Sequence, residues 1–368
     1  MRVKDKPLFT PGPLTTSATV KQAMLRDLGS RDIEFIETVR DVRRRLLAIA
    51  GVSQAQGFEA ILMQGSGTFV IESVISSVMP RDGKLLVIIN GAYGERIGKM
   101  ARIHGIETIV LKYRENELPR SDDIDAALDD SSIAMVAVVH CETTSGIMNP
   151  IEEIGQVVRK HDRRYFVDSM SAFGAVPFDF EACAVDYLVS SANKCIEGVP
   201  GFGFAICRRD VLLETEGRAR TLSLDLLEQW RGLESNGQFR FTPPTHAILA
   251  FDQALRELEA EGGVSGRADR YRKNHELLVV GMRKMGFVEY VPVELQGYII
   301  TSFRYPDHPN FEFEPFYSML NDRGFVIYPG KVTDADCFRI GNIGHLFTDD
   351  IQELLNAIND VSREMEIA

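Results

Sequence analysis

The first two thirds of the chain alternate short apolar runs with segments of helical periodicity. Val and Ile are frequent in the runs at residues 84–90, 107–113, 134–142, 165–170, 186–194 and 201–209, as in strands that are buried on both faces of a sheet. Residues 92–105 and 150–162 have a helical period instead, and Pro150 followed by Glu152 and Glu153 is a favourable helix start. The alternation predicts an α/β domain with a mostly parallel sheet flanked by helices.

The pattern changes after about residue 240. One long helix is predicted from Thr245 to a glycine pair, and a second ends at Gly286. Short strands are expected at 288–291, 298–305, 324–330 and 337–344, before a final amphipathic helix. We therefore expect a large domain over residues 16–255 and a smaller α+β domain over residues 256–368, with residues 1–15 packing nearby.

Composition and charge narrow the class of protein. Apolar residues make up 45% and charged residues 26% of the chain, which is ordinary for a globular protein. The net charge of −12 argues against nucleic acid or an anionic membrane as a partner. No apolar run approaches the roughly 20 residues of a membrane span, and the N-terminus lacks the apolar segment of a secretory signal. Five scattered cysteines without CxxC spacing predict reduced thiols in the cytoplasm and no metal site.

The candidate chemistry centres on an acid and an amine. Asp168 ends the run YFVD, and Lys194 follows the next run, DYLVSSANK. Neighbouring parallel strands would bring the two side chains to the same edge of the sheet. Pyridoxal phosphate chemistry needs this pair, because an amine forms a Schiff base with the cofactor and an acid keeps its pyridine nitrogen protonated. The alternatives are a helix cap for Asp168 and a surface loop for Lys194.

Further candidates follow other predicted strands. Ser66, Gly67 and Thr68 lie in a Gly-rich turn before a helix, where free N–H groups favour a phosphate, although an ordinary helix cap has the same appearance. Tyr93 follows residues 84–90 and could lie flat on an aromatic ring or simply pack at a helix start. Thr143 lies in HCETTSGIMNP, where its hydroxyl could contact a cofactor or close a turn.

Two more motifs complete the set. Thr242 and Thr245 flank two prolines just before a helix, in a rigid turn that could face a partner. Arg339 lies inside an apolar strand, and a buried arginine requires an anion. That anion could be the carboxylate of a substrate or a structural Asp or Glu.

In their order, these motifs resemble the class V aminotransferases of PLP fold type I. The resemblance spans nearly the whole chain and rests on LFTPGPLTTS (8–17), LMQGSGTF (62–69), NGAYGERI (90–97), HCETTSGIMNPI (140–151), VDSMSAFGAVPFD (167–179), SSANKCIEGVPGFGF (190–204), RFTPPTH (240–246) and FRIGNIG (338–344). The residues around Lys194 and the HCETTSG segment are most similar to the branch that converts 2-aminoethylphosphonate and pyruvate to phosphonoacetaldehyde and L-alanine, in phosphonate degradation.

The resemblance implies a role for each candidate. Lys194 would bind the cofactor covalently and carry protons, and Asp168 would pair with the pyridinium nitrogen. The remaining cofactor contacts would come from a stacked ring, a phosphate turn and threonine hydroxyls, which are Tyr93, Ser66, Gly67, Thr68, Thr143, Thr242 and Thr245. Thr242 would reach the cofactor of the neighbouring subunit, which implies a homodimer with a shared active site.

Substrate recognition is less closely defined by the resemblance. Arg339 would bind the acid group of either substrate, and Arg31 is a second candidate in a region, residues 26–39, that departs from the phosphonate branch. Three alternatives stay open: an alanine/serine–glyoxylate or serine–pyruvate aminotransferase, a PLP lyase or desulfurase using Cys337, and a non-catalytic PLP-binding module.

Overall fold

A computed structural model describes residues 5–367. Seven strands form the central sheet, in the order β1-β9-β8-β7-β4-β2-β3. Only β9 runs antiparallel to its neighbours, and it does so on both sides. The strands are β1 (Phe58–Gly65), β2 (Lys84–Ile89), β3 (Thr108–Lys112), β4 (Ile133–Val139), β7 (Arg164–Asp168), β8 (Tyr187–Ser191) and β9 (Gly201–Arg208). The predicted α/β fold with a mostly parallel sheet is therefore confirmed.

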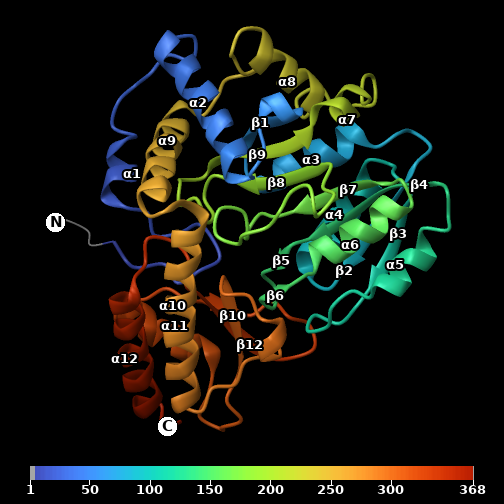
Figure 1. Ribbon diagram of the computed structural model, residues 1–368. Helices are drawn as coiled ribbons and strands as arrows, with labels where there is room; N and C mark the ends of the chain where they lie inside the picture. The colour runs from blue at the N-terminus through green and yellow to red at the C-terminus, as the bar shows by residue number, and fades with distance from the viewer. Residues whose placement is uncertain (1–4, 368) are drawn as a thin grey trace.

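Helices pack on the sheet because their apolar faces are directed at its buried strands. Both faces of the strands are buried, and one continuous apolar core runs from Val20 to Leu258. The helices of this part, shown around the sheet in Figure 1, are α1 (Ala18–Gln22), α2 (Ile33–Ile49), α3 (Gly67–Val78), α4 (Ala92–Ile103), α5 (Ser121–Ala127), α6 (Ile151–Lys160), α7 (Arg209–Leu213), α8 (Leu226–Ser235) and α9 (Thr245–Ala260), with the 3-10 turn η1 (Gln54–Gln56). A two-stranded ribbon, β5 (Cys141–Glu142) and β6 (Ile147–Met148), extends from the end of β4.

A second, smaller core forms in the C-terminal part of the chain. A three-stranded antiparallel sheet, in the order β10-β12-β11, packs with the last helices below the large sheet in Figure 1. Its elements are α10 (Gly263–Lys284), η2 (Val293–Leu295), β10 (Ile300–Arg304), α11 (Phe313–Asp322), β11 (Tyr328–Pro329), β12 (Cys337–Gly341) and α12 (Thr348–Glu364). Phe9 lies in this core, and its N–H bonds the Val326 carbonyl at 2.8 Å.

Some sequence expectations differ from the structure in detail. The strand expected at residues 288–291 is wrong, because only an isolated bridge between Glu289 and Phe303 forms there. Strand β1 was not anticipated, although its eight residues pair along the whole of β9. The domain division at residues 255 and 256 falls inside α9 and stays a prediction, and residues 1–4 of the N-terminal segment lie outside the described residues. Among the described residues, no helix is both long and apolar enough to cross a bilayer.

Candidate active site

Asp168 and Lys194 follow adjacent parallel strands, as predicted. Asp168 is the last residue of β7 and is in register with Val189 of β8. Strand β8 ends at Ser191, three residues before Lys194. The carboxyl ends of these strands meet at one edge of the sheet, where ligands of α/β proteins usually bind. The charges of the two side chains are close enough to shift the pKa of each other.

The Asp168 carboxyl is buried without a cation directly on it. Its Oδ1 accepts the Met170 N–H at 2.9 Å, and no group in residues 5–367 donates to Oδ2. Burial raises its pKa to about 7, and the charge of Glu142 adds to the rise. A buried acid with one free oxygen fits a protonated ring nitrogen, which would supply both a donor and a positive charge.

Lys194 carries an amine that burial makes easier to deprotonate. Burial lowers its pKa, and the charges of Tyr93 and Asp168 oppose that shift. Its Nζ donates to the Pro11 carbonyl at 2.5 Å, so the N-terminal segment lies against the amine. Gly12 has φ +123°, and a Cβ there would lie 2.6 Å from Nζ. The close approach of this segment to Lys194 therefore requires glycine at position 12.

A buried ionic cluster holds the loop that carries Lys194. The Glu197 N–H bonds the Lys194 carbonyl at 2.7 Å. The Glu197 carboxylate, 2% exposed, accepts from Arg270 at 2.7 Å and from the Tyr271 hydroxyl at 2.6 Å, and it pairs with Arg267 at 3.2 Å. The Tyr271 hydroxyl in turn accepts the N–H of Gly344. The lysine loop is thus tied to α10 and to the turn after β12.

The predicted phosphate turn opens α3. Ser66 is the N-cap residue of this helix, but its side chain makes no capping hydrogen bond, so the ordinary cap weighed from the sequence does not form. The first N–H groups of a helix have no partner within the helix and attract anions. Arg96 of α4 donates to the Thr68 hydroxyl at 3.2 Å. A cation, the hydroxyls of Ser66 and Thr68 and the first helix N–H groups therefore lie together at this turn.

Tyr93 is held by the segment that contains Thr143. The Glu142 carboxylate accepts the N–H groups of Tyr93 and Gly94 at 3.2 and 3.3 Å. The Thr144 hydroxyl accepts the N–H of Ala92, so the start of α4 is fixed by two side chains of residues 140–150. Burial alone would raise the pKa of the Tyr93 phenol. The Thr143 side chain and nearby positive charges outweigh that effect and lower it.

Arg339 is buried in β12 without an acidic partner. Its side chain donates to the carbonyls of Pro329 and Thr143, at 3.0 and 2.8 Å. No carboxylate within residues 5–367 pairs with it, so the structural ion pair weighed from the sequence does not form. Burial lowers the pKa of Arg339, and the nearby Tyr93 opposes that shift. An arginine with this environment favours an added anion.

The remaining candidates lie apart from these groups. Thr242 is exposed, and its carbonyl faces the Gln64 side chain at 3.4 Å. Thr245 begins α9, and Arg31 is exposed in the turn before α2. Their roles toward a neighbouring subunit or a substrate stay predictions. Cys337 is buried, and burial raises its pKa to about 12, so it is a neutral thiol and poorly suited to the nucleophilic chemistry of a desulfurase.

Together, these residues fit the predicted cofactor. Lys194 offers an amine, Asp168 a free carboxylate oxygen, Tyr93 an aromatic ring, and the start of α3 an anion site. The sequence reasoning missed Arg96 and Lys331, whose cationic groups lie 4.8 and 4.7 Å from the centre of the Tyr93 ring. Arg96 was detectable, because it is three residues after Tyr93 on the same helix and therefore on the same face. Lys331 lies between β11 and β12 in the C-terminal part of the chain, and no local pattern linked it to Tyr93.

Comparison with known proteins agrees with this arrangement. The family model of class V aminotransferases matches residues 15–334. The 2-aminoethylphosphonate–pyruvate transaminase of Syntrophobacter fumaroxidans is 50% identical over 96% of this chain and 95% of its own, and that of Vibrio cholerae is 49% identical over 95% and 96%. The ureidoglycine–glyoxylate aminotransferase structure from Bacillus subtilis has the same fold, with a TM-score of 0.90 at 20% identity over 100% of this chain and 95% of that one. The chain therefore belongs to the class V aminotransferases and has their fold, PLP fold type I.

Proposed function

We propose that this chain is a pyridoxal phosphate-dependent transaminase that moves the amino group of 2-aminoethylphosphonate to pyruvate, with phosphonoacetaldehyde and L-alanine as products. The observation that carries the proposal is about 50% identity along almost the entire chain to relatives with that activity in their names. The likeness covers the lysine loop, the acid strand and the strand with Arg339, and it favours this reaction over the alanine/serine–glyoxylate and serine–pyruvate alternatives.

Each site residue has a task that follows from its surroundings. Bound pyridoxal phosphate supplies an electron sink for the pair left when the donor carbon loses a proton. The Lys194 amine, with its lowered pKa, would take that proton from the donor carbon that bears nitrogen and deliver it to the cofactor carbon bound to the same nitrogen, and with pyruvate it would carry a proton in the opposite direction. Asp168 keeps a proton on the ring nitrogen, because its carboxylate needs a cationic partner in a buried position.

The other residues hold and orient the reactants. Tyr93 would stack on the cofactor ring, Thr143 would contact it through its hydroxyl, and Ser66, Gly67 and Thr68 would hold its phosphate at the start of α3. Arg339 binds the acid group of the donor or of pyruvate, since it is buried with only carbonyl partners. The Pro11–Gly12 segment lies on the Lys194 amine and keeps water away from it.

We also propose a cytoplasmic homodimer with a shared active site. Phe69 and Phe241 are 51% and 43% exposed, and Gln64 donates to the Phe241 carbonyl at 2.9 Å. Exposed aromatic side chains are typical of protein interfaces. The exposed Thr242 would then meet the cofactor phosphate of the partner subunit. The five buried free thiols support a reducing compartment.

A donor screen tests the proposed reaction. The purified protein, loaded with pyridoxal phosphate, is mixed with pyruvate and one amine at a time, and L-alanine is measured. We expect 2-aminoethylphosphonate to exceed serine and other amino acids by at least tenfold in kcat/KM. A serine rate equal to or above it would instead support the serine–pyruvate alternative. If none of the donors gives L-alanine, the result would support a non-catalytic PLP-binding module.

A further inference from the structure

Two cations from the small domain converge on Tyr93. The Lys331 Nζ lies 4.7 Å from the centre of the Tyr93 ring. The charge of Arg339 is close enough to the Tyr93 hydroxyl to lower the pKa of the phenol. The two cations belong to one structural unit, because Tyr328 of β11 pairs with Arg339 of β12 and the Pro329 carbonyl accepts from the Arg339 Nε at 3.0 Å. Lys331 lies two residues after Pro329 in the chain.

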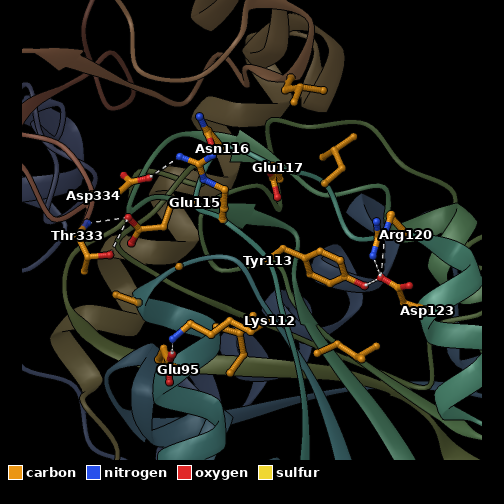
Figure 2. A pocket seen from close by; sticks show the side chains of 17 residues that line it. Glu95, Lys112, Tyr113, Glu115, Asn116, Glu117, Arg120, Asp123, Thr333 and Asp334 are labelled. Atoms are coloured by element: carbon orange, nitrogen blue, oxygen red, sulfur yellow. Dashed lines mark hydrogen bonds and ion pairs between the residues drawn. The ribbon is translucent and has the colours of Figure 1, made fainter.

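The segment that carries Lys331 is fixed at both ends. Before the lysine, Gly330 passes so close to β12 that a Cβ would lie 1.9 Å from the Cys337 carbonyl. After it, Glu115 of the large domain accepts the Thr333 N–H at 2.7 Å and the Thr333 hydroxyl at 3.2 Å, as Figure 2 shows. The position of Lys331 over Tyr93 is therefore set by contacts on either side of it.

The acids near Lys331 have other partners. Asp334 accepts from the Tyr290 hydroxyl and pairs with Arg114 at 3.6 Å, and Glu115 is bound to Thr333 (Figure 2). Among residues 5–367, no carboxylate pairs with Lys331 or with Arg339. The site thus offers two positive charges, one buried and one exposed, with no protein anion assigned to either.

Two charges suit a phosphonate better than a carboxylate. A carboxylate carries one negative charge and two oxygens, which Arg339 alone can satisfy. A phosphonate has three oxygens and, like a phosphate monoester, approaches two negative charges near neutral pH. We propose that Lys331 is the specificity-determining residue that pairs with the second charge of the phosphonate while Arg339 binds its first, an inference that rests on the proposed function. Pyruvate and L-alanine then use Arg339 without needing Lys331.

The experiment compares two amino donors on the same loaded enzyme. Lys331→Met and Lys331→Arg are measured in single-turnover reactions with 2-aminoethylphosphonate and, separately, with L-alanine. We expect Lys331→Met to lose tenfold to a hundredfold in the second-order rate constant for the phosphonate, mainly through weaker donor binding and not through the limiting rate, and less than twofold for alanine. Lys331→Arg should recover most of the phosphonate activity. Lys112→Met is the matched control, because this exposed lysine pairs with Glu95 at 2.7 Å in the pocket that Glu115 and Thr333 also line (Figure 2), and its loss should affect neither donor.

A binding measurement separates this inference from the proposed reaction. Titration calorimetry on the loaded enzyme uses ethylphosphonate and propionate, which have no amino group. We expect Lys331→Met to raise the Kd of ethylphosphonate at least tenfold and to leave that of propionate unchanged. Equal losses for both ligands, or no loss for either, would overturn the role of Lys331. If the wild-type enzyme ignores 2-aminoethylphosphonate but the ethylphosphonate difference persists, the proposed donor is wrong and the phosphonate-binding role of Lys331 stands.

Discussion

The buried carboxyl of Asp168 should lower the folding stability of the cofactor-free protein. Its carboxyl is 2% exposed and has one backbone hydrogen bond, to Met170. Replacement by asparagine keeps an Oδ1 acceptor for that bond and removes the charge. We therefore expect Asp168→Asn to stabilise the cofactor-free protein and, at the same time, to weaken binding of pyridoxal phosphate by more than tenfold.

The size of the stabilisation follows from the pKa. Burial raises the Asp168 pKa from its ordinary 3.8 to about 7. A raised carboxyl pKa means that the folded protein holds the proton more tightly than the unfolded chain. Stability is therefore lost as the pH rises from about 4 to about 7, and the loss is complete above that range. At about 1.4 kcal/mol per pKa unit, the Asp168 carboxyl destabilises the folded protein by about 4 kcal/mol at pH 8, where it is ionised, and by less than about 2 kcal/mol at pH 5, where folding keeps it protonated, both as upper bounds.

Urea unfolding of the two cofactor-free proteins at pH 8 and pH 5 measures the effect. Asp168→Asn should have the larger free energy of unfolding at pH 8, and its advantage should shrink by more than half at pH 5. Asp179→Asn is the control, because exposed Asp179 also accepts backbone N–H groups, from Glu181 and Ala182 at 2.9 Å. An Asp168→Asn protein no more stable than the wild type at pH 8, or an advantage independent of pH, would refute the assigned environment.

Three other substitutions test parts of the site. Lys194→Ala should abolish transamination and the visible absorbance that develops when pyridoxal phosphate binds the wild type; a spectrum and rate like those of the wild type would remove Lys194 from the site. Gly12→Ala should lower kcat at least tenfold, because the new Cβ would meet the Lys194 amine, whereas Gly217→Ala, at φ +74° in open space, should cost stability but not turnover. Glu197→Gln should lower the free energy of unfolding by about 2 kcal/mol, since it removes the more deeply buried of the two carboxylates that Arg267 and Arg270 share and leaves them Glu261 alone. Arg272→Gln on the same helix, whose ion pair is exposed, should change it by less than 1 kcal/mol.

Much of the fold could be predicted because the large domain follows local rules. Strands β2, β4, β7 and β8 are apolar runs with Val and Ile, and α6 has its acids at the start and its bases at the end. Their parallel order placed Asp168 and Lys194 at one edge. Strand β1 was not predicted, because its apolar run continues directly into the Gly-rich turn before α3 and has no polar turn to mark its end.

The rest of the site depends on contacts between distant segments. Residues 288–291 lie along the free edge of β10, yet among the described residues they form one bridge there, with hydrogen bonds from the Tyr290 N–H to the Ser302 carbonyl and from the Arg304 N–H to the Val288 carbonyl, and no longer ladder. Pro11 meets Lys194 across 183 positions of the chain, and Glu142 fixes the start of α4 from another strand. Periodicity describes neighbours along a strand or helix, so it carries no information about such pairs.

Because the protein has a negative net charge, its binding of anionic ligands depends on the positive side chains close to the site. A net charge of −12 should repel a phosphonate at long range. At physiological ionic strength, salt screens exposed charges beyond about 8 Å, so the distant acids lose most of their effect. The cationic groups of Arg96 and Lys331 lie within 5 Å of the Tyr93 ring centre, and the charge of Arg339 reaches the same phenol. We therefore expect this cluster to determine the binding of both a cofactor phosphate and an acidic substrate, although the whole molecule has the opposite charge.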